Sequence, residues 1–297
     1  MTDSISFLAP FQYEFMIRAM IVGALVGTVC ATLSCFLILK GWSLMGDAIS
    51  HAVLPGIVIA YVVGVPLALG AFCSGLFCAS ATGYIKENSR IKEDAVMGIV
   101  FTGLFALGLI LVSKVEADIH LMHVLFGSLL GISESDVIQT SIVAGVTLLV
   151  VVLMRKDLLL YCFDANHARS IGLNVRVLHY VLLSLLAATI VASLQAVGII
   201  MVIALLITPG AIAYLLSDRF GVMIWIAIGS AVFSCLAGVY VSFFINGSTS
   251  GCIVLMLGII FVLAMIFAPK HGLIVRGRWR KSHVKPWSDQ ENAAKPT

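Results

Sequence analysis

Charge is scarce in this chain. Of its 297 residues only 11% are Asp, Glu, Lys or Arg, whereas 61% are hydrophobic, and the mean hydropathy is +1.10. These values lie far outside the composition of soluble domains and exclude an ordinary soluble protein. We therefore expect an all-α polytopic membrane protein that contacts membrane lipid and has no nucleic-acid partner.

Two catalytic motifs are absent as well. The sequence has no G-x-x-x-x-G-K-[ST] phosphate loop, so the chain cannot hydrolyse ATP by the usual route and its energy must come from a partner or a gradient. It has no H-E-x-x-H, which argues against an intramembrane zinc protease. The seven cysteines are odd in number and form no C-x-x-C pair, which indicates structural thiols rather than a thiolate metal site.

Long apolar runs recur along nearly the whole chain, and each is close to the roughly 20 residues that cross a hydrocarbon core. They predict 8 or 9 transmembrane helices in a permease domain at 16–270, after an extracytoplasmic segment at 1–15 and before a basic and polar cytoplasmic tail at 271–297. The predicted segments are 16–39, 47–64, 66–85, 94–113, 135–154, 176–194, 197–215, 221–245 and 250–269.

Lys and Arg set the predicted orientation, because short cytoplasmic loops carry an excess of both. With the N-terminus outside, Arg18 and Lys114 are the only basic residues at outer positions. The opposite orientation would reverse nearly every loop. We therefore expect a protein of the bacterial plasma (inner) membrane, with its N-terminus outside and its C-terminus in the cytoplasm.

Asp47 stands apart from the other acidic residues, because it is the only Asp or Glu inside a predicted span rather than in a loop, a tail or at a segment edge. In a helix it shares a face with His51, four residues later. Both side chains are costly in a bilayer unless something compensates them, and a divalent metal ion is the simplest candidate. Pro55 has no N–H to give, so the carbonyl of residue 51 is also left free beside the ring.

Simpler interpretations of the pair remain open. Asp47 is well placed to be the N-cap of the second segment, and a single intramembrane His51 can bond to a neighbouring helix. Two side chains are also too few for a divalent metal, which takes about four to six donors. A two-fold dimer would bring two Asp47 and two His51 to one pathway, so we expect a functional homodimer.

A second polar cluster lies on the predicted outer side and includes Glu116 and Asp118. It could concentrate cations at an entrance, with His120 and His123 as metal contacts, although a solvated loop with interfacial histidines is the favoured interpretation. The remaining histidines are interpreted as surface residues at or beyond the cytoplasmic ends: His167, His179, His271 and His283.

Two segments on the predicted cytoplasmic side are candidates for contact with a partner. Residues 163–172 form a short polar stretch that ends in Gly and predicts a surface helix. In residues 208–221 the Pro209-Gly210 pair is expected to break an apolar run before a charged turn, which would place a helix-turn-helix at the cytoplasmic boundary. We interpret this second segment as a docking knob.

Several motifs together resemble one family. GDAISHAVLPG, at 46–56, is similar to the signature that follows the first span in the membrane permease subunits of ATP-binding-cassette importers for manganese, iron and zinc, which are related in fold to the vitamin B12 and haem-iron permeases. DANHARSIGLNV, VGIIMVIALLITPGAIAYLL and NGSTSG resemble the family pattern in order and spacing, and LMHVLFGSLLGIS is closer to the manganese and iron branch. The resemblance covers roughly residues 15–270.

The resemblance implies a type II ABC importer permease that carries Mn²⁺, Fe²⁺ or Zn²⁺ as cargo and holds no permanent cofactor. It implies Asp47 and His51 as metal contacts. The implied partners are a second copy of the chain, a cytoplasmic ABC ATPase dimer and an extracytoplasmic metal-binding protein. The implied ATPase-coupling residues are Pro209, Gly210, Asp218 and Arg219, together with Asp164, Arg169 and Gly172.

Two other functions are weighed against this one. In a proton-coupled secondary transporter, Asp47 would titrate as the proton carrier, but such a carrier needs no docking knob. An intramembrane metalloenzyme would need a third ligand or a catalytic base near the pair, and the sequence places neither there.

Overall fold

The computed structural model describes residues 9–115 and 129–268, and within these ranges every regular element is a helix. Short 3-10 turns, η1 and η2, precede the first helix and α6. The elements are η1 (Ala9–Gln12), α1 (Glu14–Lys40), α2 (Met45–Val63), α3 (Leu67–Glu87), α4 (Glu93–Lys114), η2 (Leu129–Gly131), α6 (Glu134–Leu153), α7 (Arg155–Phe163), α8 (Ala165–Ser170), α9 (Val175–Val197), α10 (Ile199–Leu216), α11 (Phe220–Ile245) and α12 (Thr249–Phe267).

Nine of the described helices are long and apolar enough to cross a membrane, and α7 and α8 are the two that are not. The nine correspond one to one to the nine predicted segments. Their ends differ most at α9, which was predicted to end at residue 194 and ends at Val197. The prediction of an all-α multi-pass membrane protein is confirmed.

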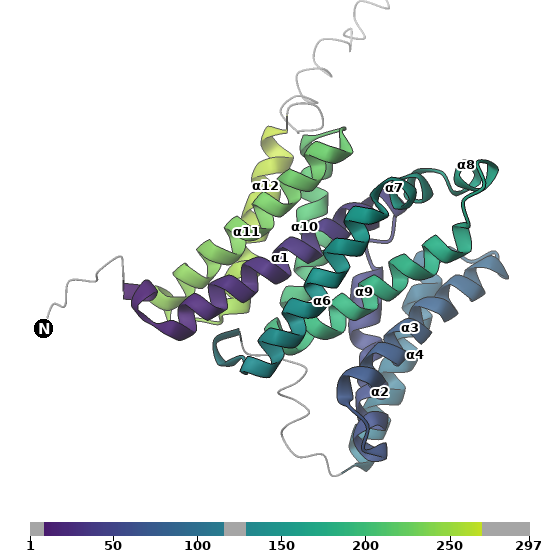
Figure 1. The fold of residues 1–297 in the computed structure, drawn as a ribbon. Coiled ribbons are helices and arrows are strands. Elements are labelled where there is room, and N and C mark those ends of the chain that lie inside the picture. Colours follow the sequence, from purple (N-terminus) through teal and green to yellow (C-terminus); the bar gives the residue numbers. More distant parts are fainter. Residues whose placement is uncertain (1–8, 116–128, 269–297) are drawn as a thin grey trace, which may run out of the picture.

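The helices form two groups joined by α6 and α9 (Figure 1). In the first group, α10, α11 and α12 pack on one another, and α10 and α11 pack on α1; in the second, α2 packs on α3 and α4. Helix α9 lies against α6, α2 and α3, and α2 also contacts α10. The metal-site candidate on α2 therefore sits where the second group meets the first.

Helix α1 forms much of the core. Its second half is almost entirely buried, with Leu33, Cys35 and Phe36 at 0% exposure. Five of the seven cysteines are buried and all seven are free thiols, which agrees with structural thiols. Because α1 contacts α10 and α11 as well as α6 and α9, it links the first group to the two helices that join the groups.

Helices α9 and α10 are joined by Gly198 alone. Gly198 has φ 83°, a conformation that L side chains rarely adopt. A single residue in this conformation turns the chain from one span into the next, with the Gly198 N–H donating to the Leu194 carbonyl. This connection brings the N-terminal end of α10 beside the end of α9.

The predicted break at Pro209-Gly210 is wrong, because α10 runs through both residues to Leu216. A proline in a helix interior removes one backbone hydrogen bond and normally kinks or ends the helix. Here Ser34 of α1 adds hydrogen bonds to the backbone on both sides of the proline: its Oγ donates to the Ile207 carbonyl at 3.2 Å and accepts the Gly210 N–H at 2.9 Å. The predicted turn after the helix is present at residues 217–219.

Candidate metal-binding pair and cytoplasmic surface

Asp47 and His51 lie on one face of the first two turns of α2. The helix begins at Met45 and its N-cap is Leu44, so Asp47 is the third helical residue and the N-cap interpretation is wrong. The Nδ1 atom of His51 lies 3.0 Å from the Asp47 carbonyl oxygen and 3.1 Å from Asp47 Oδ1. The predicted side-by-side placement of a carboxylate and an imidazole is therefore present.

These two contacts favour one tautomer of a neutral His51 ring. A carbonyl oxygen can only accept a hydrogen bond, so Nδ1 must carry the proton that it shares with the oxygens of Asp47. The lone pair of the neutral ring is then on Nε2, which is the atom available to a metal ion. Metal-binding histidines commonly donate their other ring N–H to a carboxylate or a carbonyl in this way.

The pair is neither buried nor fully open. The side chains of Asp47 and His51 are 31% and 30% exposed, and the other groups of α2 at this level are packed. Gly46 lies against Leu206 of α10, while the His51 ring contacts Phe101 and Phe105 of α4, with ring centroids 5.9 and 5.3 Å apart. The half-exposed face leaves room for further donors to approach.

A third protein ligand does not come from the rest of the described chain. In residues 9–115 and 129–268 no group of three or more His, Cys, Asp or Glu could hold a metal ion. The carbonyl of residue 51, which Pro55 cannot reach with an N–H, is the one backbone oxygen predicted beside the pair. The described part of one protomer thus offers one carboxylate, one imidazole and this carbonyl.

Helix α2 stays continuous through Pro55 with help from α3. Ser74 of α3 donates its hydroxyl to the Ala52 carbonyl at 2.6 Å. Directly after the proline, Gly56 meets Gly70 of α3 so closely that a Cβ on either glycine would collide with the backbone of the other. The turn that carries His51 is therefore fixed against α3 as well as α4.

The two parts of the predicted docking knob have different surroundings. Pro209 and Gly210 are buried inside α10, and a Cβ on Gly210 would collide with Ser34. Asp218 and Arg219 are exposed in the turn before α11. If the segment contacts a partner, the exposed turn makes the contact and the buried pair holds the helix behind it.

The turn before α11 is tied to α7. The ring of Phe220 lies 5.0 Å from that of Phe36 in α1, and the guanidinium of Arg155 in α7 lies 5.8 Å from the Phe220 ring centroid. A Cβ on Gly221 would come 3.2 Å from the same guanidinium. The turn before α11 therefore packs against the start of α7, the helix that precedes α8, and Figure 1 shows α7 and α8 next to one another.

The predicted surface helix at 163–172 is present as α8. Asp164 caps it, accepting the N–H groups of Asn166 at 2.9 Å and His167 at 3.0 Å. These hydrogen bonds, that of His167 first, lower the pKa of Asp164 from its ordinary 3.8. The helix ends before Gly172, whose φ of 90° favours glycine, and Arg169 is exposed on it.

His179 was predicted to be a surface residue and is instead part of a packed polar cluster. Its Nδ1 lies 2.8 Å from the hydroxyl of Tyr161 and its ring packs edge-on to Trp42. Lys40 Nζ lies 4.0 Å from the Tyr161 ring centroid, a cation-π distance. Burial raises the pKa of the neighbouring Cys162 thiol to about 12, with Lys40 acting in the opposite direction. The cluster joins the end of α1 to α7 and α9.

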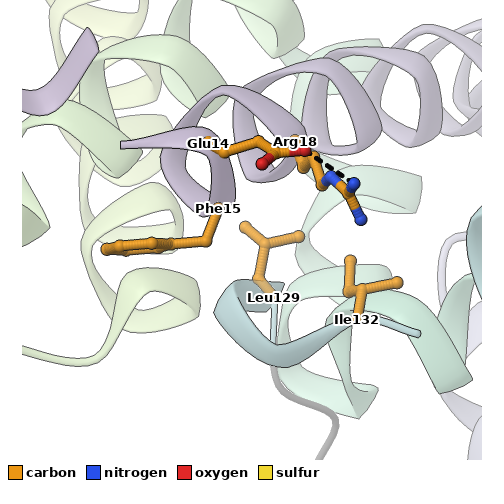
Figure 2. Close-up of a pocket in the computed structure, with 5 residues that line it drawn as sticks. All are labelled: Glu14, Phe15, Arg18, Leu129 and Ile132. Carbon is orange, nitrogen blue, oxygen red and sulfur yellow. Dashed lines mark hydrogen bonds and ion pairs between the residues drawn. The ribbon is translucent and has the colours of Figure 1, made fainter. Parts of the chain in front are cut away.

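At the other end of the bundle, α1 and η2 frame a pocket of about 370 Å³. Figure 2 shows Arg18 bonded to Glu14 beside the apolar side chains of Leu129 and Ile132. Arg18 also reaches Glu134 at 3.3 Å. All three charged side chains are well exposed, so these ion pairs contribute little to stability.

The outer polar cluster lies outside the described residues. This holds for Glu116, Asp118, His120 and His123, and also for the tail at 271–297 with His271 and His283. The predictions for these residues, including metal contact by His120 and His123, remain predictions.

Sequence reasoning missed the side chains that reach the candidate site from other helices. Phe101 and Phe105 carry a weak signal, since their spacing of four places both on one helix face. Ser34 and Ser74 carry none, because serine is common in transmembrane helices for several reasons. Their roles depend on which helices are neighbours.

Comparisons with known proteins give one consistent result. A model of the ABC 3 transport family matches residues 12–268. The manganese transport system membrane protein MntB of Synechocystis sp. is 57% identical over 283 residues, which cover 95% of this chain and 92% of that protein. The chelated iron transport system membrane protein YfeD of Yersinia pestis is 56% identical over 284 residues, which cover 96% and 91%.

A solved structure has the same fold. The structure described as PsaBC from Streptococcus pneumoniae in complex with Fab superposes with a TM-score of 0.81 at 35% sequence identity. The match covers 94% of this chain and 99% of that one. The fold described above is thus shared along nearly the full length of both chains.

Proposed function

This chain belongs to the ABC 3 transport family, and on that premise we propose that it is the permease subunit of an ATP-driven importer of Mn²⁺ or Fe²⁺, with Zn²⁺ as a further candidate. Relatives named for manganese and for chelated iron are almost equally similar to it. Asp and His donors accept all three ions, and coordination geometry decides among them. The chain moves the ion and a partner hydrolyses ATP.

The observation that carries the proposal is the Asp47 and His51 pair. A carboxylate and an imidazole, each about a third exposed, lie on one face of the first two turns of a predicted membrane span, and an ionisable pair inside a span is costly unless something compensates it. A passing divalent cation would offset that cost. Because the protomer supplies few donors, the ion would be held weakly enough to leave, as transport requires.

A second permease chain would complete the site. A two-fold axis beside the exposed face of α2 would bring together two carboxylates and two imidazoles, which approaches the four to six donors, roughly, that first-row divalent ions take. We propose a second copy of this chain as that partner. The half exposure of Asp47 and His51 supports it, because a face left open in one protomer is available to another.

Two further partners are part of the proposal. An ABC ATPase dimer would dock on the cytoplasmic end, where Asp218, Arg219 and α8 are exposed. An extracytoplasmic metal-binding protein would deliver the ion at the opposite end. Nine spans in the described residues agree with termini on opposite sides of the membrane, and the Lys and Arg distribution supports an outer N-terminus and a cytoplasmic C-terminus in a bacterial inner-membrane protein.

Radiotracer uptake in cells tests the proposal. We expect Asp47→Ala and His51→Ala each to abolish uptake of radioactive Mn²⁺ and Fe²⁺ while the protein still accumulates in the membrane. Competition between unlabelled Mn²⁺, Fe²⁺ and Zn²⁺ would then rank the three ions. Intact uptake in both variants would make the pair structural, and uptake that collapses with the proton gradient while ATP is maintained would favour a secondary transporter.

A further inference from the structure

The His51 imidazole is held from two sides. On its own helix, Nδ1 is bonded to the oxygens of Asp47 at 3.0 and 3.1 Å. From α4, the rings of Phe101 and Phe105 pack against it, the first tilted by 45° and the second edge-on at 80°. The first restraint is local in sequence, whereas the second comes from a different membrane helix.

The two phenylalanines belong to a stripe on α4 that continues to Gly108. Positions spaced by three and four residues share a helix face, and this face is turned toward α2. A Cβ on Gly108 would come 2.9 Å from the side chain of Leu54 and 3.0 Å from that of Pro55. The missing side chain lets α4 approach α2, and the same register places the two rings at His51.

A free imidazole would not keep Nε2 aimed in one direction. Rotation of the ring about its bond to Cβ would break the bond from Nδ1 and point Nε2 elsewhere. The rings of Phe101 and Phe105 restrict this rotation, because packed rings cannot pass through one another. The two contacts therefore select the orientation that the Asp47 bonds also favour.

We propose that Phe101 and Phe105 are positioning residues that hold His51 with Nε2 presented to the transported divalent ion, and that Gly108 sets the approach from which they act. The inference rests on the proposed function, because it takes His51 as a metal contact. The phenylalanines donate nothing to the ion. They raise its affinity by removing side-chain freedom that binding would otherwise have to restrict.

The test compares two variants of the full-length chain: the double variant Phe101→Leu/Phe105→Leu and the control Phe233→Leu. Uptake of radioactive Mn²⁺ by cells is measured for both. Phe233 is 60% exposed on α11, so its substitution removes an equivalent ring from an outer face. Groups that orient a metal-binding histidine are typically worth about 10- to 100-fold in affinity, and an aromatic contact is worth roughly 2- to 13-fold. We expect a 3- to 10-fold rise, roughly, in the Mn²⁺ concentration for half-maximal uptake, with the maximal rate unchanged. Phe105→Tyr, which keeps the ring, should resemble the unchanged protein.

A spectroscopic measurement separates positioning from general packing. In the purified full-length protein with saturating Mn²⁺, electron spin echo measurements detect nitrogen modulation from a bound imidazole. The modulation should weaken in Phe101→Leu/Phe105→Leu and persist in Phe233→Leu. Gly108→Ala, which displaces α4 from α2, should share the defect, whereas Gly103→Ala on the same helix should not, because its Cβ meets nothing within 4 Å.

Each outcome decides the inference. Unchanged half-saturation and nitrogen modulation in the double variant would overturn it, and so would equal losses in Phe233→Leu. If the double variant does not accumulate, Phe105→Leu and the comparison of Gly108→Ala with Gly103→Ala decide instead. His51→Ala is measured in parallel. Intact uptake in His51→Ala would overturn the proposed function itself. Lost uptake in His51→Ala together with normal uptake in the phenylalanine variants would overturn only the positioning role.

Discussion

Helices α2 and α10 share the same local packing arrangement around a proline but expose different side chains. Each has a proline followed by a glycine, at Pro55-Gly56 and Pro209-Gly210, and each remains a continuous helix. In both, a serine from a neighbouring helix bonds to the backbone beside the proline: Ser74 to α2 and Ser34 to α10. In both, the glycine allows close backbone approach to the helix that supplies the serine.

The two helices differ in the residues that flank the proline and glycine. Before its proline α2 carries Asp47 and His51, both about a third exposed. At the equivalent positions α10 carries Met201 and Leu205, both buried, and the charged residues of this segment come only after the helix has ended. The comparison teaches that the proline and glycine determine helix packing, while the neighbouring side chains determine whether the segment can meet an ion or a cytoplasmic partner.

Filling the glycines should have the largest effect on stability. We expect Gly56→Ala and Gly210→Ala each to destabilise the fold by about 2 kcal/mol or more, because the new methyl group meets backbone that cannot move aside. Gly103→Ala, in open space, should instead stabilise α4 by roughly 0.5–1 kcal/mol. Melting temperatures of the detergent-solubilised protein would measure this, and equal shifts in all three variants would contradict the close contacts.

Removing the serines should distinguish the two helices. Ser34→Ala removes two hydrogen bonds, the acceptor for the buried Gly210 N–H and the donor to the Ile207 carbonyl, and should cost about 1–3 kcal/mol, whereas Ser74→Ala removes one donor to a carbonyl and should cost about 0.5–1.5 kcal/mol. Ser234→Ala is the control, because this serine bonds only within its own helix, to the Ser230 carbonyl. A smaller melting shift for Ser34→Ala than for Ser74→Ala would reverse the assignment.

Substitutions within α10 and in the turn that follows it should separate a packing role from a docking role. Pro209 is buried and Arg219 is exposed, so Arg219→Glu should lower the amount of co-purified ATPase by about fivefold, a typical effect of an interface charge. Pro209→Ala should retain the ATPase and slow uptake by changing the motion of α10. Loss of the ATPase from Pro209→Ala alone would place the contact at the proline.

The smallest effect is expected at α8, which packs on α7 and α9. Its cap depends on the Asp164 carboxylate, whose pKa is lowered by two backbone N–H groups. A lowered pKa means that the cap is complete above the ordinary value of 3.8 and is lost only as the pH falls through the lower folded value. Hydrogen exchange of the α8 amides should therefore show faster opening in Asp164→Ala and little change in Asp164→Asn. Opening of α8 in the unchanged protein should not depend on protonation of Asp164 between about pH 6 and 8.

The nine spans and the Asp47 and His51 pair were predictable from the sequence because both are local. An apolar run bounded by charge identifies a span whatever its neighbours are, and a spacing of four residues fixes a shared helix face. The surface helix α8 was predictable for the same reason, since its Asp cap and terminal glycine act within one turn. The homodimer and the roles of the site residues remain predictions.

The tertiary structure alone decided which side chains from other helices complete these local features. Phe101 is distant in sequence from His51, and Ser34 is farther still from Gly210, yet each pair is in contact. Inside a membrane most helix faces are apolar, so hydrophobicity does not select neighbours; close packing at small residues and interhelical hydrogen bonds do. For that reason the sequence determined where the helices are and which polar pair they carry, whereas packing at Gly56, Gly108 and Gly210 decided what surrounds them.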